Sequence, residues 1–337
     1  MKSTGHRLGK ILSIVIVGMA LVTLPQIYKS GYVTNFFIDL VRWTIFALSY
    51  DLIAGHVSAV SLGQPVFYGL GAYVAALMGP KIGLGFFGSL ALAAILMAIL
   101  ALGAGIAFFR IRRVTFAIGT LGAGIIAQII VNSATSITGG AMCKVGIQRP
   151  ELAIPFTETI IKIVKPLQYY YLLLPMLAIT LLIYWALTTG RIGRSFSSVR
   201  EDEIRASAVG IYPLRYRLLA FAVGSGIAGA LGAFQASYLT VVCPTEMSLE
   251  ITTTLLIIVF VGGTASLRGV LLGSLLFTLL PRILELVGGQ AFTPAYQQVV
   301  YGVILVLVML FLPDGLDGLI KRITHRKQDR GKGAVQI

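Results

Sequence analysis

The sequence predicts an all-α, polytopic membrane helix bundle with about ten transmembrane segments, and its composition and apolar runs carry that prediction. Of 337 residues, 57% are hydrophobic and only 12% are charged, which is about half the charged share of a soluble domain. The apolar residues gather in runs close to the ~20 residues that a spanning helix needs. This composition excludes an ordinary soluble enzyme, a disordered chain and a secreted disulfide scaffold.

About ten runs are candidate spans, and the third is short enough to be a re-entrant or broken helix. They cover residues 11–27, 36–54, 66–79, 84–109, 114–131, 169–188, 218–242, 249–264, 270–287 and 297–313. The first run follows basic residues, as in a signal peptide, but no small-residue cleavage site comes after it. We therefore expect an uncleaved first span.

Lysine and arginine are shared unequally between the two sets of segments that connect these spans. Most of the 27 basic residues lie near the N-terminus, at 110–113, at 191–217, at Arg268 and in the tail. Cytoplasmic segments are enriched in Lys and Arg, so both termini are expected in the cytoplasm. Counting 66–79 as a crossing keeps this bias on one side. In a membrane protein the net charge of +14 indicates topology, and no nucleic-acid partner is expected.

The chain therefore divides into a single transmembrane domain, 1–320, and a solvated basic cytoplasmic tail, 321–337. The sequence contains no phosphate-binding Gly-x-x-x-x-Gly-Lys-[Ser/Thr] loop, no His-Glu-x-x-His helix and no Gly-x-Ser-x-Gly turn. Its three histidines are too scattered for a metal site. We expect no catalytic residue, no metal and no cofactor in this chain.

The two cysteines, Cys143 and Cys243, both fall on the predicted outer side. An oxidising compartment would permit a bridge between them. Sequence cannot show proximity, and free cysteine commonly behaves as a small apolar residue. Two unpaired thiols are the favoured interpretation.

The inner loop, residues 190–217, is the most charged internal segment. Acidic residues at 201–203 favour the start of a helix through its N-terminal dipole, and Gly210 suits a helix end. The loop is expected to hold a short charged cytoplasmic helix. Taken alone, such a loop can also be only a solvated face.

Charged residues inside spans cost several kcal/mol unless they are paired or hydrated. Asp39 and Arg42, and likewise Arg282 and Glu285, are three residues apart and so share a helix face. Each pair either marks a pathway or neutralises itself near the outer helix end. Candidate path residues are the polar groups within apolar stretches, foremost Ser61, Gln64, Tyr68, Thr120 and Thr138.

Several stretches resemble a known family. The inner loop reads Arg200-Glu201-Asp202-Glu203-Ile204, followed by Ala206 and Gly210. Further matches are the stretches Ser49-Tyr50-Asp51-Leu52-Ile53-Ala54-Gly55, Ser61-Leu62-Gly63-Gln64, Phe116-Ala117-Ile118-Gly119-Thr120, Val261-Gly262-Gly263-Thr264 and Leu312-Pro313-Asp314-Gly315. Together they resemble the branched-chain amino acid permease family of ABC importers, in its LivM-like branch. Asp51 and His56 depart from it, since an amide and a small or aromatic residue are expected there.

The resemblance implies a multi-pass permease subunit of the bacterial plasma (inner) membrane that carries branched-chain amino acids by alternating access. It implies two ABC ATPase subunits that use ATP, a second related permease and an extracytoplasmic solute-binding protein as partners. It also implies that the inner loop couples this chain to the ATPases. The coupling residues would be Arg200, Glu201, Asp202, Glu203, Ala206 and Gly210.

Two other functions stay open at this point. One is an ABC permease for urea, short amides or a sugar. The other is a proton-coupled secondary carrier that uses Asp39, Asp51 or Glu285 as a relay. The substrate, and whether the permeases form a homo- or heterodimer, also stay open.

Overall fold

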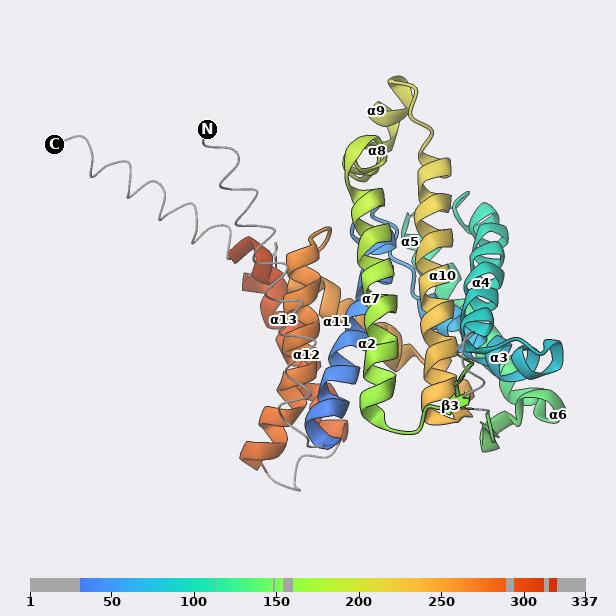
Figure 1. The fold of residues 1–337 in the computed structure, drawn as a ribbon. Coiled ribbons are helices and arrows are strands. Elements are labelled where there is room, and N and C mark those ends of the chain that lie inside the picture. The colour runs from blue at the N-terminus through green and yellow to red at the C-terminus, as the bar shows by residue number, and fades with distance from the viewer. Residues whose placement is uncertain are drawn as a thin grey trace, which may run out of the picture.

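The computed structural model describes residues 31–111, 113–147, 149–153, 160–288, 294–311 and 315–319. The predicted first span, 11–27, and the tail, 321–337, lie outside these residues. The described chain forms a bundle of long helices (Figure 1). These are α2 (Gly31–Ala54), α3 (Gln64–Ile82), α4 (Phe86–Phe108), α5 (Arg113–Ser133), α7 (Pro166–Thr188), α10 (Pro213–Leu239), α11 (Leu249–Gly262), α12 (Leu267–Gly288) and α13 (Pro294–Phe311).

Each predicted span after the first coincides with one of these helices, so the all-α bundle is confirmed. Four described helices are long and apolar enough by themselves to cross a membrane: Phe86–Phe108, Val114–Ser133, Pro166–Thr188 and Pro213–Leu239. The others are shorter or more polar. The number of crossings and their orientation therefore stay predictions.

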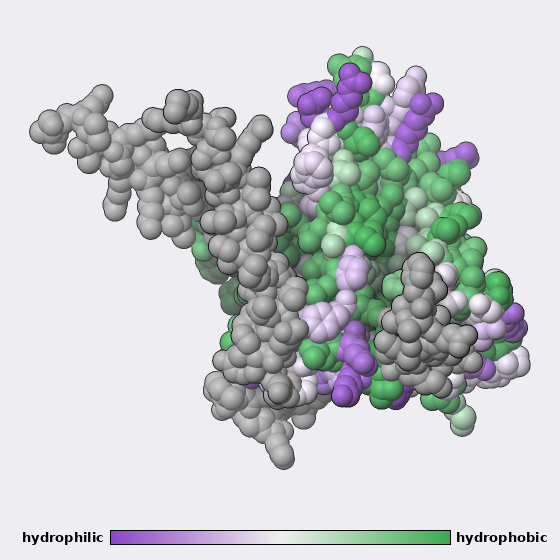
Figure 2. All heavy atoms as spheres, in the orientation of Figure 1, coloured by the Kyte–Doolittle hydropathy of each residue, from purple (hydrophilic) through white to green (hydrophobic). Residues whose placement is uncertain are grey.

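The bundle has two polar ends separated by an apolar belt. At one end lie α8 (Gly190–Glu201) and α9 (Glu203–Ala208), and at the other lie α6 (Thr135–Thr138) and β3 (Ile160–Lys162) (Figure 1). We call the first the α9 end and the second the disulfide end, after the Cys143–Cys243 bond described below. Hydrophilic side chains gather at both ends in Figure 2, with hydrophobic ones between them. This is the surface that a bilayer-spanning protein needs.

Helix α10 is the central helix. It packs against α4, α3 and α2. Of its most apolar 18-residue stretch 78% is buried, whereas 22–28% is buried in the other three apolar helices. Its many small residues allow this close packing. A Cβ at Gly232 would collide with the carbonyl oxygen of Tyr68 in α3, and one at Gly273 in α12 would collide with that of Ile258 in α11. Glycine is required at both helix crossings.

The third predicted span corresponds to α3, which a non-helical segment precedes. Helix α2 ends at Ala54, residues 55–63 are not helical, and α3 begins at Gln64. The backbone amide of Leu62 donates to Thr120 Oγ1 of α5 at 3.0 Å, and its carbonyl accepts from Thr252 Oγ1 of α11 at 3.0 Å. Because Thr120 lies within α5, the non-helical segment reaches into the bundle. Such backbone is tolerated at membrane depth only where protein surrounds it.

The disulfide end is closed by short strands and a covalent bond. Strand β1 (Lys144–Val145) pairs antiparallel with β4 (Val241–Val242), and β2 (Glu151–Ala153) pairs with β3. Cys143 and Cys243 form a disulfide. The expectation of two unpaired thiols is therefore wrong. The β1–β4 pairing brings the two residues together across 100 positions of sequence, which spacing alone cannot reveal.

Removing this disulfide should lower thermal stability. A disulfide that closes a long loop typically stabilises a fold by about 2–4 kcal/mol. We expect Cys143→Ser to lower the midpoint of thermal unfolding in detergent by several degrees, and Cys143→Ser/Cys243→Ser to lower it equally. Reductant should lower the wild-type midpoint to the same value and leave the variants unchanged. Equal midpoints for variant and oxidised wild type would contradict a structural role.

Candidate translocation and coupling site

Buried polar side chains lie where α2, α3 and the 55–63 segment meet. Ser61 and Gln64 are fully buried, and neither the Ser61 hydroxyl nor the Gln64 amide has a hydrogen-bond partner within the described chain. The Tyr50 hydroxyl of α2 is likewise buried without one. A buried polar group left unsatisfied costs about 1–3 kcal/mol. These groups are therefore suited to receive a polar solute or water.

Tyr68 continues this line toward the disulfide end. Its ring stacks on Phe46 of α2 with centroids 4.8 Å apart, and its buried hydroxyl has no hydrogen-bond partner within the described chain. Arg42, Phe46 and Tyr50 share one face of α2 because they are four residues apart. Gln64 and Tyr68 share a face of α3 for the same reason. Of the predicted path residues, Gln64 and Tyr68 are thus brought together.

Thr120 and Thr138 make structural hydrogen bonds. Thr120 Oγ1 accepts from Leu62 and donates to the carbonyl of Ala117 at 2.9 Å. Thr138 Oγ1 donates to the carbonyl of Val131 at 2.6 Å, at the turn beyond α5. Thr120 lies with Ser61 along a groove of about 250 Å³ between α3, α4 and α5, whereas Thr138 lies at the disulfide end.

A charged cluster joins α2 to α12 near the disulfide end. Arg42 Nη2 lies 3.2 Å from Asp39 Oδ1, as the sequence pattern predicts, and Arg282 Nη2 lies 4.0 Å from Asp39 Oδ2. Arg282 thus reaches across to α2, and the side chain of its predicted partner Glu285 lies outside the description. Glu246, in the short helix η2 (Pro244–Met247), also interacts with Arg42. Burial raises the pKa of the Glu246 carboxyl, and Arg42 opposes that rise.

The short helix predicted in the inner loop is confirmed as α9, whereas its cytoplasmic location stays a prediction. Asp202 caps it, since its Oδ1 accepts from the backbone amides of Ile204 at 2.9 Å and Arg205 at 3.2 Å. Gly210 ends the segment with a φ of 81°, a conformation that favours glycine. Ala206 is buried.

Two charged residues of this region hold it to the bundle. Glu203 forms an ion pair with Arg217 of α10, and Arg200 of α8 donates to Thr264 Oγ1 at 3.3 Å. Glu203 is therefore part of the loop's own structure. Glu201 lies exposed at the end of α8.

Sequence reasoning missed an exposed apolar tip on this helix. Ile204 and Val209 have 83% and 74% of their surfaces exposed, and α9 projects from the bundle beyond the long helices (Figure 1). We treat these two exposed residues as a candidate contact surface. Burial cannot be read from a charged stretch, so only the structure separates these two residues from the buried Ala206.

A hydrogen-bonded turn lies beside α8 and α9, which together we call the α8–α9 arm. The turn, residues 263–266, joins α11 to α12, and Ala265 adopts a left-handed φ of 55°. Asp51 of α2 holds it, because Asp51 Oδ1 accepts from the Ala265 amide at 2.8 Å and Oδ2 accepts from the Tyr184 hydroxyl of α7 at 2.7 Å. Asp51 is fully buried.

His56 completes the group around Asp51. Its Nε2 lies 2.9 Å from the Tyr184 hydroxyl and 3.6 Å from Asp51 Oδ2. Asp51 and His56 are the two residues that depart from the family pattern in sequence. The structure shows that they are neighbours, so the two departures form one arrangement.

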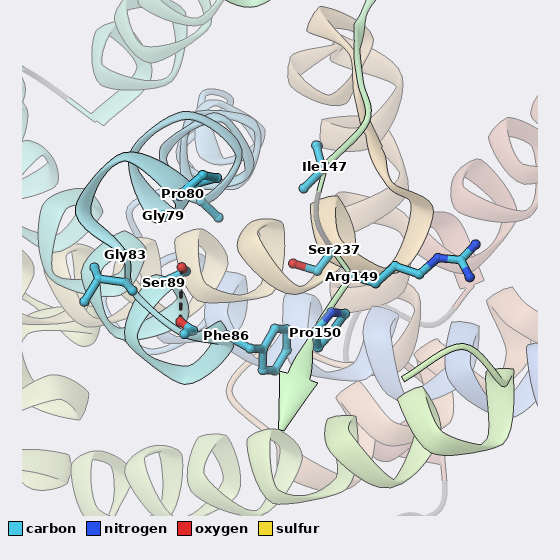
Figure 3. A pocket seen from close by; sticks show the side chains of 12 residues that line it. Gly79, Pro80, Gly83, Phe86, Ser89, Ile147, Arg149, Pro150 and Ser237 are labelled. Carbon is cyan, nitrogen blue, oxygen red and sulfur yellow. Dashed lines mark hydrogen bonds between the residues drawn. The ribbon is translucent and has the colours of Figure 1, made fainter. Parts of the chain in front are cut away.

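Neither Gln64 nor Tyr68 lines the groove beside Ser61 or either of two further cavities. One cavity of about 240 Å³ lies at the disulfide end, where Gly79, Pro80 and Phe86 face Pro150 and Ser237 (Figure 3). An almost wholly apolar groove of about 510 Å³ lies between α4, α7 and α10. No group of three or more His, Cys, Asp or Glu residues in the described chain could hold a metal ion.

Comparison with known proteins identifies the family. The family described as "Branched-chain amino acid transport system / permease component" matches residues 32–309. The high-affinity branched-chain amino acid transport system permease protein LivM of Escherichia coli K12 is 27% identical over 346 residues, covering 98% of this chain and 80% of that protein. LivM of Salmonella typhimurium LT2 is 28% identical over 308 residues, covering 86% and 71%. No solved structure matches the chain.

The helical bundle, the apolar belt and the projecting α9 are the architecture of an integral membrane transporter, and the family match extends over nearly all of the described helices. The LivM relatives are transport permease subunits. The chain therefore belongs to the family of permease components of branched-chain amino acid transport systems.

Proposed function

We propose that this chain is a multi-pass permease subunit of an ABC importer in the bacterial inner membrane. It carries branched-chain amino acids by alternating access, driven by ATPases outside the chain. The exposed apolar tip of α9, Ile204 with Val209, supports this proposal most directly. A carrier that works alone has no need of an apolar tip projecting from its cytoplasmic end.

The tip fits a protein partner. Ile204 lies in the first turn of a capped six-residue helix, Glu203–Ala208, and Val209 directly follows that helix. The Glu203–Arg217 ion pair fixes the helix against α10. A preorganised apolar surface loses little conformational freedom when it docks. We assign this surface to one of two ABC ATPase subunits, which bind the ATP. The chain itself holds no cofactor.

The Gln64–Tyr68 line fits the passage of a small solute. Its polar groups lie between apolar and aromatic neighbours. Because α3 begins at Gln64, the positive end of the helix dipole lies there. A helix N-terminus of this kind favours a carboxylate. A second related permease and an extracytoplasmic solute-binding protein complete the proposed transporter.

Purification of the complex tests the assembly. The tagged chain is expressed with its proposed ATPase and permease partners and solubilised gently, and co-purifying chains are identified by mass spectrometry. We expect a P-loop ATPase and a second permease. In proteoliposomes with the binding protein, ATP should drive leucine uptake, and an ATPase variant without its P-loop lysine should abolish it. Recovery of the chain alone, under conditions that preserve a known ABC complex, would contradict the proposal.

A charge at the α9 tip should prevent docking. Ile204→Asp places a carboxylate where an apolar contact is expected, so recovery of the ATPase with the tagged chain should fall about tenfold, equivalent to ~1.4 kcal/mol. Membrane insertion should be unchanged. Val145→Asp makes the same change at an exposed site of the disulfide end and should leave recovery intact. Equal recovery for Ile204→Asp and wild type would remove α9 as the docking helix.

Loss of the Gln64 amide should impair passage without affecting assembly. Gln64→Leu keeps a similar volume but removes both unpartnered polar atoms, so leucine uptake should fall about tenfold while ATPase recovery stays constant. The control is Thr180→Val in α7, where the buried hydroxyl donates within its own helix to Met176 at 2.8 Å. If Gln64→Leu transports as well as the control, Gln64 does not line the path.

A further inference from the structure

We propose that the 263–266 turn transmits movement of the α8–α9 arm to the translocation path, with Asp51 and Arg200 as its positioning residues. This inference rests on the proposed function and assigns the route by which ATPase movement reaches the solute. The turn is hydrogen-bonded to α8 and follows α11, which is hydrogen-bonded to the segment that carries Ser61 and leads into Gln64.

The first link joins the arm to the turn. Arg200 lies in the last turn of α8, directly before the Asp202 cap of α9, and its guanidinium donates to Thr264 Oγ1 at 3.3 Å. A displacement of α9 therefore moves Arg200 and pulls on Thr264. Arginine suits this role because its planar guanidinium holds a fixed donor geometry.

The second link joins the turn to the path. Helix α11 begins at Leu249 and ends at Gly262, so it runs as one rigid element into the turn. Thr252, near its other end, is buried and donates to the carbonyl of Leu62 at 3.0 Å. Leu62 lies between Ser61 and Gly63, directly before α3. A shift of α11 would therefore also move Ser61 and Gln64, whose polar side chains have no partner within the described chain.

The third link fixes the turn against the bundle. Asp51 accepts from the Ala265 amide and from Tyr184, so the turn is tied to α2 and α7. A left-handed conformation at a residue other than glycine is unfavourable and persists only when its surroundings enforce it. Ser266 Oγ also donates to Asp317 Oδ2 at 2.8 Å, which ties the turn to residues 315–319. These bonds hold the Ala265–Ser266 side of the turn in place, while Arg200 pulls on Thr264 at its other side.

A labelling experiment tests this route without depending on the solute. Both cysteines of the chain are in the disulfide, so Ser61→Cys introduces a single free thiol at the path. Maleimide labelling of this thiol is measured in the full complex, with ATP plus vanadate and without nucleotide. We expect the labelling rate to change several-fold on adding ATP plus vanadate.

The variants Arg200→Gln, Thr264→Val and Asp51→Ala should each remove most, but not all, of this nucleotide-dependent change while the ATPase still co-purifies. Arg200→Gln/Thr264→Val should lose no more than either single variant, because both remove the same bond. Asp51→Asn should retain more of the change than Asp51→Ala, since its amide oxygen still accepts from Ala265. Arg268→Gln removes an exposed arginine near the turn and should behave as the background.

The outcomes are separable. A nucleotide-dependent change that keeps its full size in Arg200→Gln and Asp51→Ala overturns the inference, and so does a double variant whose loss is additive. A purely structural role would lower the thermal midpoint and reduce ATPase recovery in the same variants, which also overturns it. Absence of leucine uptake in a complex that shows the change contradicts the proposed substrate and leaves the route standing.

Discussion

Unpaired backbone groups cannot be left inside a bilayer. The backbone of the non-helical segment 55–63 therefore needs hydrogen-bond partners from neighbouring helices. Its Leu62 amide and carbonyl find partners on α5 and α11, through Thr120 and Thr252. Those two helices must therefore stand beside α3. The side chains of Ser61 and Gln64 gain no partner from this arrangement. The same non-helical segment thus joins α3, α5 and α11, and it leaves the polar side chains of Ser61 and Gln64 for a solute.

The two ends of the bundle are held with different strengths. At the disulfide end a covalent bond and the β1–β4 pairing join segments 100 residues apart. At the α9 end the joining contacts are noncovalent, such as the hydrogen bonds of Asp51 with Ala265 and of Arg200 with Thr264 and the Glu203–Arg217 ion pair. Each hydrogen bond is worth about 1 kcal/mol net, or up to ~3 kcal/mol with a charged partner. Bonds of that size can break and re-form during a transport cycle, so movement is expected at the α9 end.

Sequence reasoning predicted what local patterns determine. Apolar runs gave the helices after the first span, and the acidic start with Gly210 gave α9, because capping and helix dipoles act within a few residues. Contacts between distant segments were beyond it. The Cys143–Cys243 bond depends on strand pairing. Arg282 of α12 lies against Asp39 of α2, and Thr120 accepts a hydrogen bond from the backbone of Leu62. Asp51 and His56 were visible only as departures from a family pattern, with no sign in sequence that they meet.

The positions of the carboxylates bear on the rival function of a proton-coupled carrier. Asp39 is engaged by Arg42 and Arg282, and Asp51 accepts from Ala265 and Tyr184. The two residues are twelve positions apart on α2, about 18 Å at 1.5 Å per residue. Phe46 lies between them along α2 and stacks on Tyr68. A relay needs titratable groups within hydrogen-bond reach or joined by water. Between these carboxylates the described chain offers an aromatic stack, whereas the Arg200–Thr264 link offers a direct mechanical connection. The architecture favours a subunit moved by a partner over one driven by protons.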